Sequence, residues 1–231
     1  MATEKNQAQT EKEAVKESTL DNTMEFWSKY SKHILITFAT VAVLLGGYYG
    51  YDLLIARPAE TAANEAMWKA QENFKIDSFQ LALNGDGTKL NPGFLKVISK
   101  NSGTKSANSA HFYAGVCYLQ LGDFKNAVKY LEDFSTTDNE LLMRTQGCLA
   151  DAHSELGNTE KAIAYYKEAS TTFETDEYNS AEYLFRLGQL YDKTGKKQEA
   201  IAAFSDLKTK FPTTMRANEV DKYLARLGAT N

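Results

Sequence analysis

The feature that most constrains the fold is a repeat in the C-terminal half of the chain. Three segments align with one another, and each carries apolar residues at spacings of three and four on both sides of a glycine. They are residues 108–134, 143–169 and 181–207, and their central glycines, Gly122, Gly157 and Gly195, are nearly evenly spaced. Self-similarity at such a period indicates a stack of similar helical units. Each unit is therefore expected to be two helices joined by a turn at its glycine, which tolerates a left-handed backbone.

Small residues predict where the two helices of a unit meet. They are Gly115, Ala150 and Gly188 in the first helices, facing Ala127, Ala162 and Ala200 in the second. The whole spacing resembles that of tetratricopeptide repeats, helix-turn-helix units of about 34 residues. The third unit matches most fully, through Leu187-Gly188, Tyr191, Gly195, Ala200, Phe204 and Pro212. The second departs from the pattern at His153, where tyrosine is usual, and lacks the final proline. The resemblance implies an all-α solenoid.

The segments beside the repeats are expected to be helical too. After Pro212, one apolar stripe indicates a terminal capping helix, and its members are Ala217, Val220, Tyr223, Leu224 and Leu227. Residues 57–107 are expected to form a diverged helical repeat with a turn at residues 84–87, Asn-Gly-Asp-Gly. This run lacks the later acidic ligands of a calcium loop, so a turn is favoured over a calcium site.

A second feature is a stretch without charge, Ile34 to Tyr51, in a chain whose mean hydropathy is −0.45. Its 18 residues approach the roughly 20 that cross a hydrocarbon core, and Leu53, Leu54 and Ile55 extend it past Asp52. Aromatic residues typical of membrane interfaces flank it, namely Trp27, Tyr30, Tyr48, Tyr49 and Tyr51. A cleaved signal peptide is the alternative, but the leader before the stretch is too long for one and no small-residue cluster follows it directly. We therefore expect an uncleaved transmembrane helix.

The ends of this helix bear on its packing and orientation. Gly46, Gly47 and Gly50 include a G-x-x-x-G spacing that could let a partner helix approach, although glycine is also simply tolerated in membrane helices. Lys29 and Lys32 precede the stretch, which favours a cytoplasmic N-terminus. Residues 1–23 are polar and lack aromatic side chains, so they are expected to be a disordered cytoplasmic tail.

Composition excludes several classes of function. The net charge is −4, and no basic run or basic face points to nucleic acid. Cys117 and Cys148 have no metal-ligand spacing and are expected to be small buried residues without a disulfide. His33, His111 and His153 have no partner at the spacing of a triad or a metal site, and phosphate-binding loops are absent from the sequence. We therefore expect a non-enzymatic protein with no catalytic, metal-binding or cofactor-binding residues.

A helical stack offers a concave face lined by its first helices, and this face is the predicted protein-binding groove. Its predicted lining is Phe112, Tyr113, Val116, Leu119, Arg144, Asp151, Phe185, Arg186 and Gln189. Tetratricopeptide domains that clamp a C-terminal carboxylate use lysine and asparagine where this chain has Phe112 and Val116. A hydrophobic or amphipathic peptide is therefore the expected ligand. The alternative is that helices within residues 64–100 pack over Phe112 and Val116 as core.

The chain as a whole resembles the bacterial YfgM-type proteins over residues 24–228, most closely the forms from Bacteroidetes. The resemblance rests on "DSFQLALNGDG", on "GFLKVISKNSGTKSANSAHFYAGVCYLQLGDF" and on an ending with "KYLARL". It implies a single-pass inner-membrane protein with periplasmic repeats, an ancillary subunit of the SecYEG translocon that acts with a PpiD-like prolyl isomerase on nascent secretory chains. A scaffold for envelope or outer-membrane protein assembly and an adaptor of reversed topology are the alternatives.

The expected organisation follows from these features. It comprises a tail at residues 1–23, a membrane anchor at 24–56, a diverged repeat at 57–107, and three tetratricopeptide repeats with a capping helix at 108–231.

Overall fold

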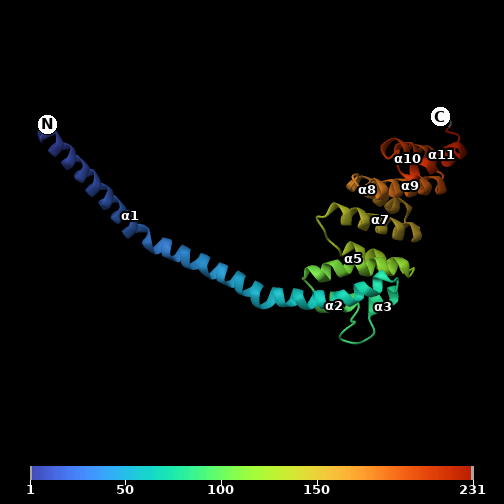
Figure 1. Ribbon diagram of the computed structural model, residues 1–231, viewed down its shortest axis with the longest axis horizontal. Coiled ribbons are helices and arrows are strands. Elements are labelled where there is room, and N and C mark those ends of the chain that lie inside the picture. Colours follow the sequence, from blue (N-terminus) through green and yellow to red (C-terminus); the bar gives the residue numbers. More distant parts are fainter. Residues whose placement is uncertain (1, 230–231) are drawn as a thin grey trace. The chain divides into compact units, whose positions relative to one another are not determined.

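The computed structural model describes residues 2–229, apart from the side chains of residues 2–22 and 25. Every regular element in this part of the chain is a helix (Figure 1). The chain divides into two units, Met1–Pro58 and Ala59–Asn231.

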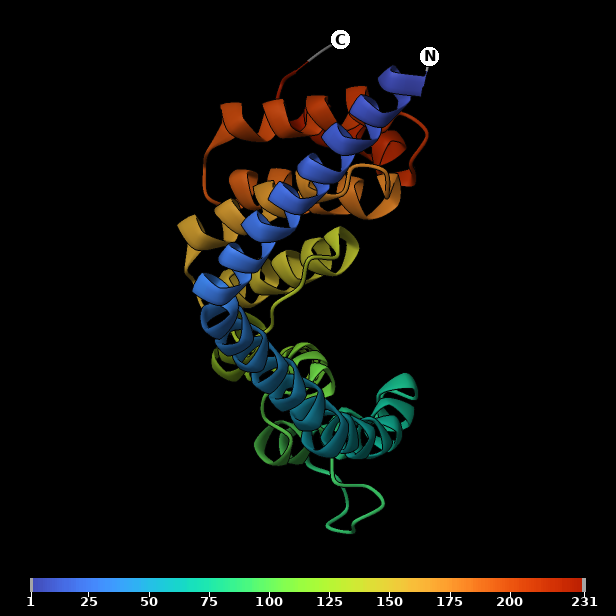
Figure 2. The same cartoon turned by 90° about the vertical axis from the view of Figure 1, so that its left-hand side faces the viewer.

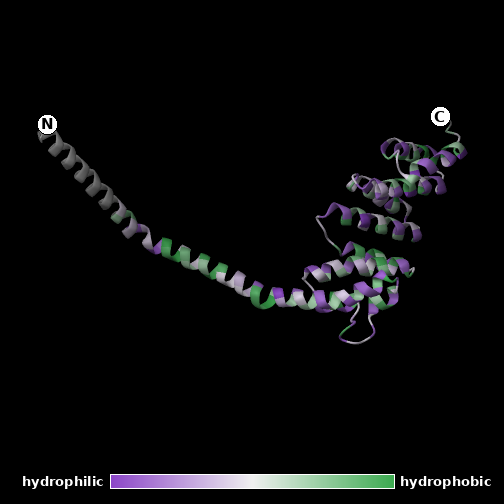
Figure 3. Ribbon diagram, viewed as in Figure 1, coloured by the Kyte–Doolittle hydropathy of each residue, from purple (hydrophilic) through white to green (hydrophobic). Residues whose placement is uncertain are grey.

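The first unit consists of α1 (Ala2–Tyr51) and the π-helical turn η1 (Asp52–Ala56). The uncharged stretch forms the last 18 residues of α1, which Figure 3 colours green and then pale, and side chains such as Phe38, Leu44 and Tyr48 are exposed. Among the described residues, this is the one helical segment whose length and composition would allow it to cross a membrane.

The start of α1 differs from the sequence prediction. The backbone is helical from Ala2 onward, within the segment expected to be a disordered tail. Alanine, glutamate, lysine and glutamine dominate residues 2–18, and these residues have high helix propensity. The same residue types are enriched in disordered segments, so composition did not distinguish the two states.

The second unit begins with three helices and continues with paired helices that stack in successive layers (Figures 1 and 2). The first three are α2 (Arg57–Lys75), α3 (Phe79–Asn84) and α4 (Phe94–Lys100). The pairs are α5 (Lys105–Gln120) with α6 (Phe124–Glu132), α7 (Asn139–Glu155) with α8 (Thr159–Thr172), and α9 (Glu177–Lys193) with α10 (Lys197–Lys210). The last helix is α11 (Met215–Arg226). The predicted all-α architecture of three repeats is confirmed.

The turn inside each repeat depends on its glycine. Gly122, Gly157 and Gly195 have φ values of 79°, 73° and 76°, in the left-handed region where a Cβ atom is unfavourable. The first helix ends just before the glycine, and the second begins shortly after it. Every repeat therefore reverses direction in a turn of the same length, which keeps successive helices in register.

Small residues hold the two helices of a repeat in close contact. A Cβ atom on Gly115 would lie 2.5 Å from Leu131 Cγ, and one on Gly188 would lie 2.5 Å from Phe204 Cε1. Such distances are far inside van der Waals contact, so glycine at these positions lets a large side chain from the second helix lie directly against the first. The facing residues Ala127, Ala162 and Ala200 are fully buried, as expected.

The helices before the first repeat bury their own apolar cluster against α5. Met67, Leu83, Phe94 and Val97 are buried with Cys117 and the small residues of α5. Residues 84–87 open the loop between α3 and α4, as predicted, and Asp86 Oδ1 accepts a hydrogen bond from the Thr88 N–H at 2.9 Å. This part of the chain therefore closes the N-terminal end of the stack.

The other end of the stack is closed by α11. Its apolar stripe is buried in the second core cluster together with Phe204, Leu207 and Phe211. Ala217, Val220, Leu224 and Leu227 are all buried, and Tyr223 packs beside them. The predicted capping helix is confirmed.

The carboxylate of Glu60 binds α2 to the start of the first repeat. Glu60 accepts hydrogen bonds from the backbone N–H groups of Lys105 and Ser106 at 2.7 and 2.9 Å, and from Ser106 Oγ at 2.6 Å. These N–H groups lie in the first turn of α5, where no intrahelical acceptor exists and the helix dipole favours a negative charge. Desolvation acts to raise the pKa of Glu60, but the hydrogen bonds from Ser106 and Lys105 outweigh it and hold the pKa below the ordinary 4.5.

We expect Glu60→Ala to lower the free energy of unfolding by about 1–2 kcal/mol, as for the loss of a helix N-cap. Because Glu60 has a lower pKa in the folded chain, its contribution is complete above pH 4.5 and disappears as the pH falls through the folded-state pKa. Urea denaturation of the full chain in detergent, followed by circular dichroism, measures both effects. Glu65→Ala, an exposed change on the same helix, is the matched control. Equal stability of the two variants at neutral pH would contradict the role of Glu60.

Candidate protein-binding site

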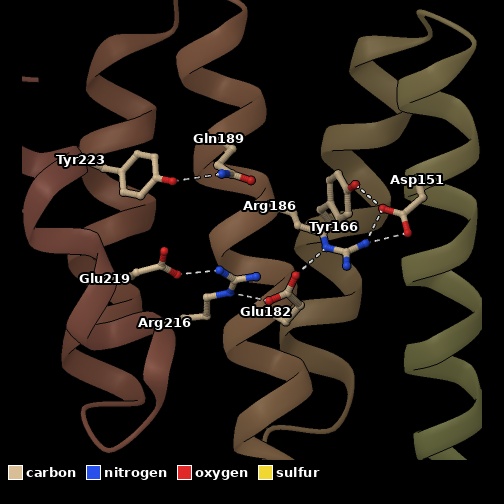
Figure 4. Close-up of polar contacts among 8 residues, drawn as sticks. All are labelled: Asp151, Tyr166, Glu182, Arg186, Gln189, Arg216, Glu219 and Tyr223. Atoms are coloured by element: carbon tan, nitrogen blue, oxygen red, sulfur yellow. Dashed lines mark hydrogen bonds and ion pairs between the residues drawn. The ribbon is translucent and has the colours of Figure 1, made fainter. Parts of the chain in front are cut away.

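The predicted groove residues lie on the first helices of the repeats. We call the side of α5, α7 and α9 that carries them, together with the adjoining side of α11, the A-helix face. Contacts between side chains 34 or 35 residues apart connect α7 to α9 and α9 to α11 on this face (Figure 4). The face is therefore continuous from the second repeat to the capping helix.

The link between α7 and α9 is an ion pair. Arg186 Nη1 donates to Asp151 Oδ1 at 2.8 Å and to Oδ2 at 2.7 Å, and the hydroxyl of Tyr166 donates to Asp151 Oδ1 at 2.5 Å (Figure 4). Burial, and after it the charge of Asp151, raises the pKa of Tyr166 far above its usual range, so the phenol stays a hydrogen-bond donor. Arg186 and Asp151 thus lie on the predicted face but are engaged with each other.

Glu182 extends these contacts to the capping helix, because it binds Arg186 on α9 and Arg216 on α11. Its carboxylate accepts from Arg186 Nε at 2.8 Å and from Arg216 Nε at 2.5 Å, and Arg216 Nη1 donates to Glu219 at 2.6 Å. Desolvation acts to raise the pKa of Glu182, but the hydrogen bonds from the two arginines lower it below the usual range. Gln189 Nε2 donates to the Tyr223 hydroxyl at 3.4 Å. We call these residues the polar ladder: Asp151, Tyr166, Glu182, Arg186, Gln189, Arg216, Glu219 and Tyr223.

Phe185 is not on the surface of the groove, and this prediction is wrong. The side chain is 2% exposed and packs edge-on against Tyr223, with ring centroids 5.2 Å apart. The Arg216 guanidinium lies 4.3 Å from the centre of its ring on the side of α11. The capping helix therefore covers a residue that the repeat pattern alone would leave open.

The first repeat has a different character. Phe112, Val116 and Leu119 are half-buried on α5, and the ring of Phe112 lies 5.5 Å from that of Phe134. Tyr113 instead belongs to the N-terminal core, stacked on Phe94 with ring centroids 5.2 Å apart. The helices of residues 64–100 therefore pack over Tyr113, whereas Phe112 and Val116 lie outside the buried cluster.

A hollow of about 410 Å³ lies between α2 and the first half of α5. Its lining is Glu60, Asn64, Met67, Gln71, Lys105, Ser106 and Ser109. Ser109 precedes Phe112 and Val116 by three and seven residues, so these two side chains follow it on the same helical face, about one and two turns further along α5. Amides and hydroxyls predominate in this lining. The sequence did not indicate this hollow, because its two walls come from segments far apart in the chain, as the hydrogen bond between Ser106 and Asn64 illustrates.

The other predicted residues make only local interactions. Arg144 is exposed and pairs with Glu140, one turn earlier on α7, at 2.8 Å. A Cβ atom on Gly46, Gly47 or Gly50 would have no atom within 4 Å, so these glycines are open on α1. A partner helix for them stays a prediction.

The described residues include no group of three His, Cys, Asp or Glu side chains placed to hold a metal ion. Both cysteines are free, and burial raises the pKa of Cys117 and Cys148 to about 12, so neither thiol ionises readily.

The ion pairs of the polar ladder could be predicted from the sequence by comparing charged residues one repeat apart. Asp151 and Arg186 lie 35 residues apart, and Glu182 and Arg216 lie 34 apart, close to the repeat period. Opposite charges at that offset on the same helical face predict an ion pair between neighbouring repeats. The sequence prediction used the repeat period for apolar residues and turns but not for charges.

Comparisons with known proteins agree with this fold. Two family profiles described as tetratricopeptide repeat match residues 109–136 and 141–207. The crystal structure of MamA protein is among the solved structures that match, with 17% sequence identity and a TM-score of 0.54 over 72% of this chain and 90% of that one. At this identity the likeness shows the fold alone. The comparison with curated proteins gave no match.

Residues 109–136 and 141–207 are therefore tetratricopeptide repeats, units whose stacked helices serve as scaffolds for protein–protein interaction.

We expect the polar ladder to couple the second and third repeats. A double-mutant cycle with Asp151→Ala and Arg186→Ala should give a coupling free energy of about 1–2 kcal/mol, because Arg186 Nη1 contacts both carboxylate oxygens and the pair is partly buried. The ion pair of Lys208 and Asp221, which is more exposed, is the matched control and should couple by less than about 1 kcal/mol. Thermal and urea unfolding of the four chains in each cycle provides the measurement. Equal coupling in the two cycles would show that the ladder adds nothing beyond a surface ion pair.

Proposed function

We propose that this protein is a non-enzymatic adaptor anchored in the bacterial inner membrane, with repeats in the periplasm that bind extended apolar or amphipathic segments of other proteins. The observation that carries the proposal is the contrast along the A-helix face. From α7 to α11 the charged side chains of the polar ladder are paired with one another, so a charged ligand would have to displace an existing partner there. At α2 and α5 the hollow offers amides and hydroxyls, and half-buried apolar side chains follow it along α5. Of the two charged residues in its lining, Glu60 already binds the first turn of α5, and the other is Lys105.

The chemistry at α5 suits an unfolded chain better than a folded partner. Side-chain amides of Asn64 and Gln71 can hydrogen-bond to the backbone of an extended peptide, whatever its sequence. Met67 lies at the same hollow, and methionine adapts to apolar groups of varied shape. Such a site would select peptides that are extended and apolar, and it would not require one particular sequence.

The placement at the Sec translocon rests on the family resemblance and on the anchor. The resemblance implies SecYEG and a PpiD-like membrane-anchored prolyl isomerase as partners, and nascent secretory chains as ligands. The uncharged stretch of α1 is long enough to hold the repeats at a membrane, and Lys29 and Lys32 before it favour a cytoplasmic N-terminus.

Binding at the first repeat can be tested with peptides. We expect Phe112→Ala combined with Val116→Ala to weaken binding of an extended, neutral, apolar peptide about tenfold, or about 1.4 kcal/mol. Fluorescence titration of the purified full chain in detergent gives the affinity. Leu141→Ala, which removes an exposed apolar side chain from α7, is the matched control and should leave the affinity unchanged. An equal loss in both variants would place binding elsewhere.

Partners and topology need an experiment in cells. A photo-crosslinking amino acid at Phe112 should capture secretory chains and translocon components, whereas the same probe at Gln198, exposed on α10, should not. Capture of outer-membrane assembly factors instead would favour the envelope scaffold. Digestion of the repeats by protease added to spheroplasts is the expected result for periplasmic repeats, and full protection would exclude that location.

A further inference from the structure

The π-helical turn after α1 exposes three consecutive large apolar side chains. Leu53, Leu54 and Ile55 are 61%, 76% and 56% exposed. They continue the row of exposed apolar side chains at the end of α1. Only Asp52 lies between Tyr51, the last residue of α1, and Leu53. Three adjacent apolar side chains in water are unfavourable by the hydrophobic effect, so their environment needs an explanation.

The charge of Asp52 is compensated within the same turn. Arg57 Nε donates to Asp52 Oδ2 at 2.8 Å, and the Arg57 backbone N–H donates to the Asp52 carbonyl oxygen. In an α-helix, side chains five residues apart point in different directions. The i to i+5 hydrogen bonds of a π-helix bring such residues nearly above one another, so η1 itself creates this ion pair.

The length of the apolar segment can be compared with the thickness of a membrane. From Ile34 to Tyr51 the uncharged stretch has 18 residues and would be about 27 Å long as a helix. This is slightly less than the roughly 30 Å of a hydrocarbon core. Ending the segment at Ile55 gives 22 residues and about 33 Å, which spans the core with a small tilt.

We infer that η1 is the last turn of the membrane-embedded segment, where lipid covers Leu53, Leu54 and Ile55 and the Asp52–Arg57 ion pair carries the carboxylate into the bilayer edge. This inference rests on the membrane anchor of the proposed function and specifies where that anchor ends. A carboxylate without a partner is costly at this depth, whereas a paired one is tolerated. Arg57 has a long stem, so its guanidinium reaches Asp52 from the polar side of the boundary.

The test is thiol accessibility in lipid. The full chain, with Cys117→Ala and Cys148→Ala, is reconstituted at high dilution in phosphatidylethanolamine–phosphatidylglycerol vesicles. Single thiols are introduced by Leu44→Cys, Leu54→Cys or Ala62→Cys, and a charged maleimide is supplied on both sides of the membrane. We expect Leu54→Cys to react at least tenfold more slowly than Ala62→Cys and about as slowly as Leu44→Cys.

The ion pair is tested in the Leu54→Cys chain. Arg57→Gln leaves Asp52 without its guanidinium partner and should move η1 toward water, so the reaction at position 54 should become at least fivefold faster. Lys69→Gln, which removes a charge from the exposed side of α2, is the matched control and should leave the rate unchanged.

The outcomes separate the inference from the proposed function. Fast reaction at position 54 with slow reaction at position 44 would overturn the inference and leave the anchor intact. Fast reaction at position 44 would show that α1 does not span the membrane, and both would fail. Protection at position 54 that disappears on dilution of the protein in lipid would assign these side chains to a second copy of the chain and also overturn the inference.

Discussion

The repeat stack depends on the close approach of two helices at one position in each unit. At Gly115 and Gly188 a Cβ atom would collide with Leu131 or Phe204, and at the same position in the second repeat Ala150 is fully buried. With almost no side chain there, the second helix can place a leucine or an aromatic ring directly on the backbone of the first. Packing at that density fixes the angle within each pair, and the pairs can then stack at a regular repeat.

The features that the sequence predicted well depend on residues close together in the chain or related by the repeat period. The helix pairs, the turn glycines and the capping stripe of α11 are of this kind. The features it missed depend on contacts between distant segments. Glu60 binds the first turn of α5 from 45 residues away, and nothing in its local sequence marks it as a cap. Phe185 was placed on the groove by its register, but its burial is decided by Arg216 and Tyr223 on a helix outside the repeats.

The polar ladder has two consequences for the A-helix face. It connects α7, α9 and α11 through hydrogen bonds to charged groups, which are stronger than neutral ones and set the spacing of the repeats. It also leaves Asp151, Glu182, Arg186 and Arg216 engaged with one another and not available to a charged peptide. Asp151 and Arg186 were predicted as groove residues and do lie on the face, but each already satisfies the other. We therefore assign the proposed recognition to the region at α2 and α5, where Phe112 and Val116 are half-buried and the charged lining residues are Glu60, which binds the first turn of α5, and Lys105.

The two acidic contacts at the start of the repeat domain lie close together in the chain. Asp52 is paired with Arg57, and only three residues later Glu60 binds the first turn of α5. Glu60 is the fifth residue after Ile55, and a chain of that length spans at most about 18 Å between its Cα atoms even when fully extended. If lipid covers Ile55, as proposed above, the covalent chain alone keeps the Cα atom of Glu60 within that distance of Ile55. Because Glu60 accepts hydrogen bonds from the N–H groups of Lys105 and Ser106, the start of α5 would then be tied to a residue that closely follows the anchor.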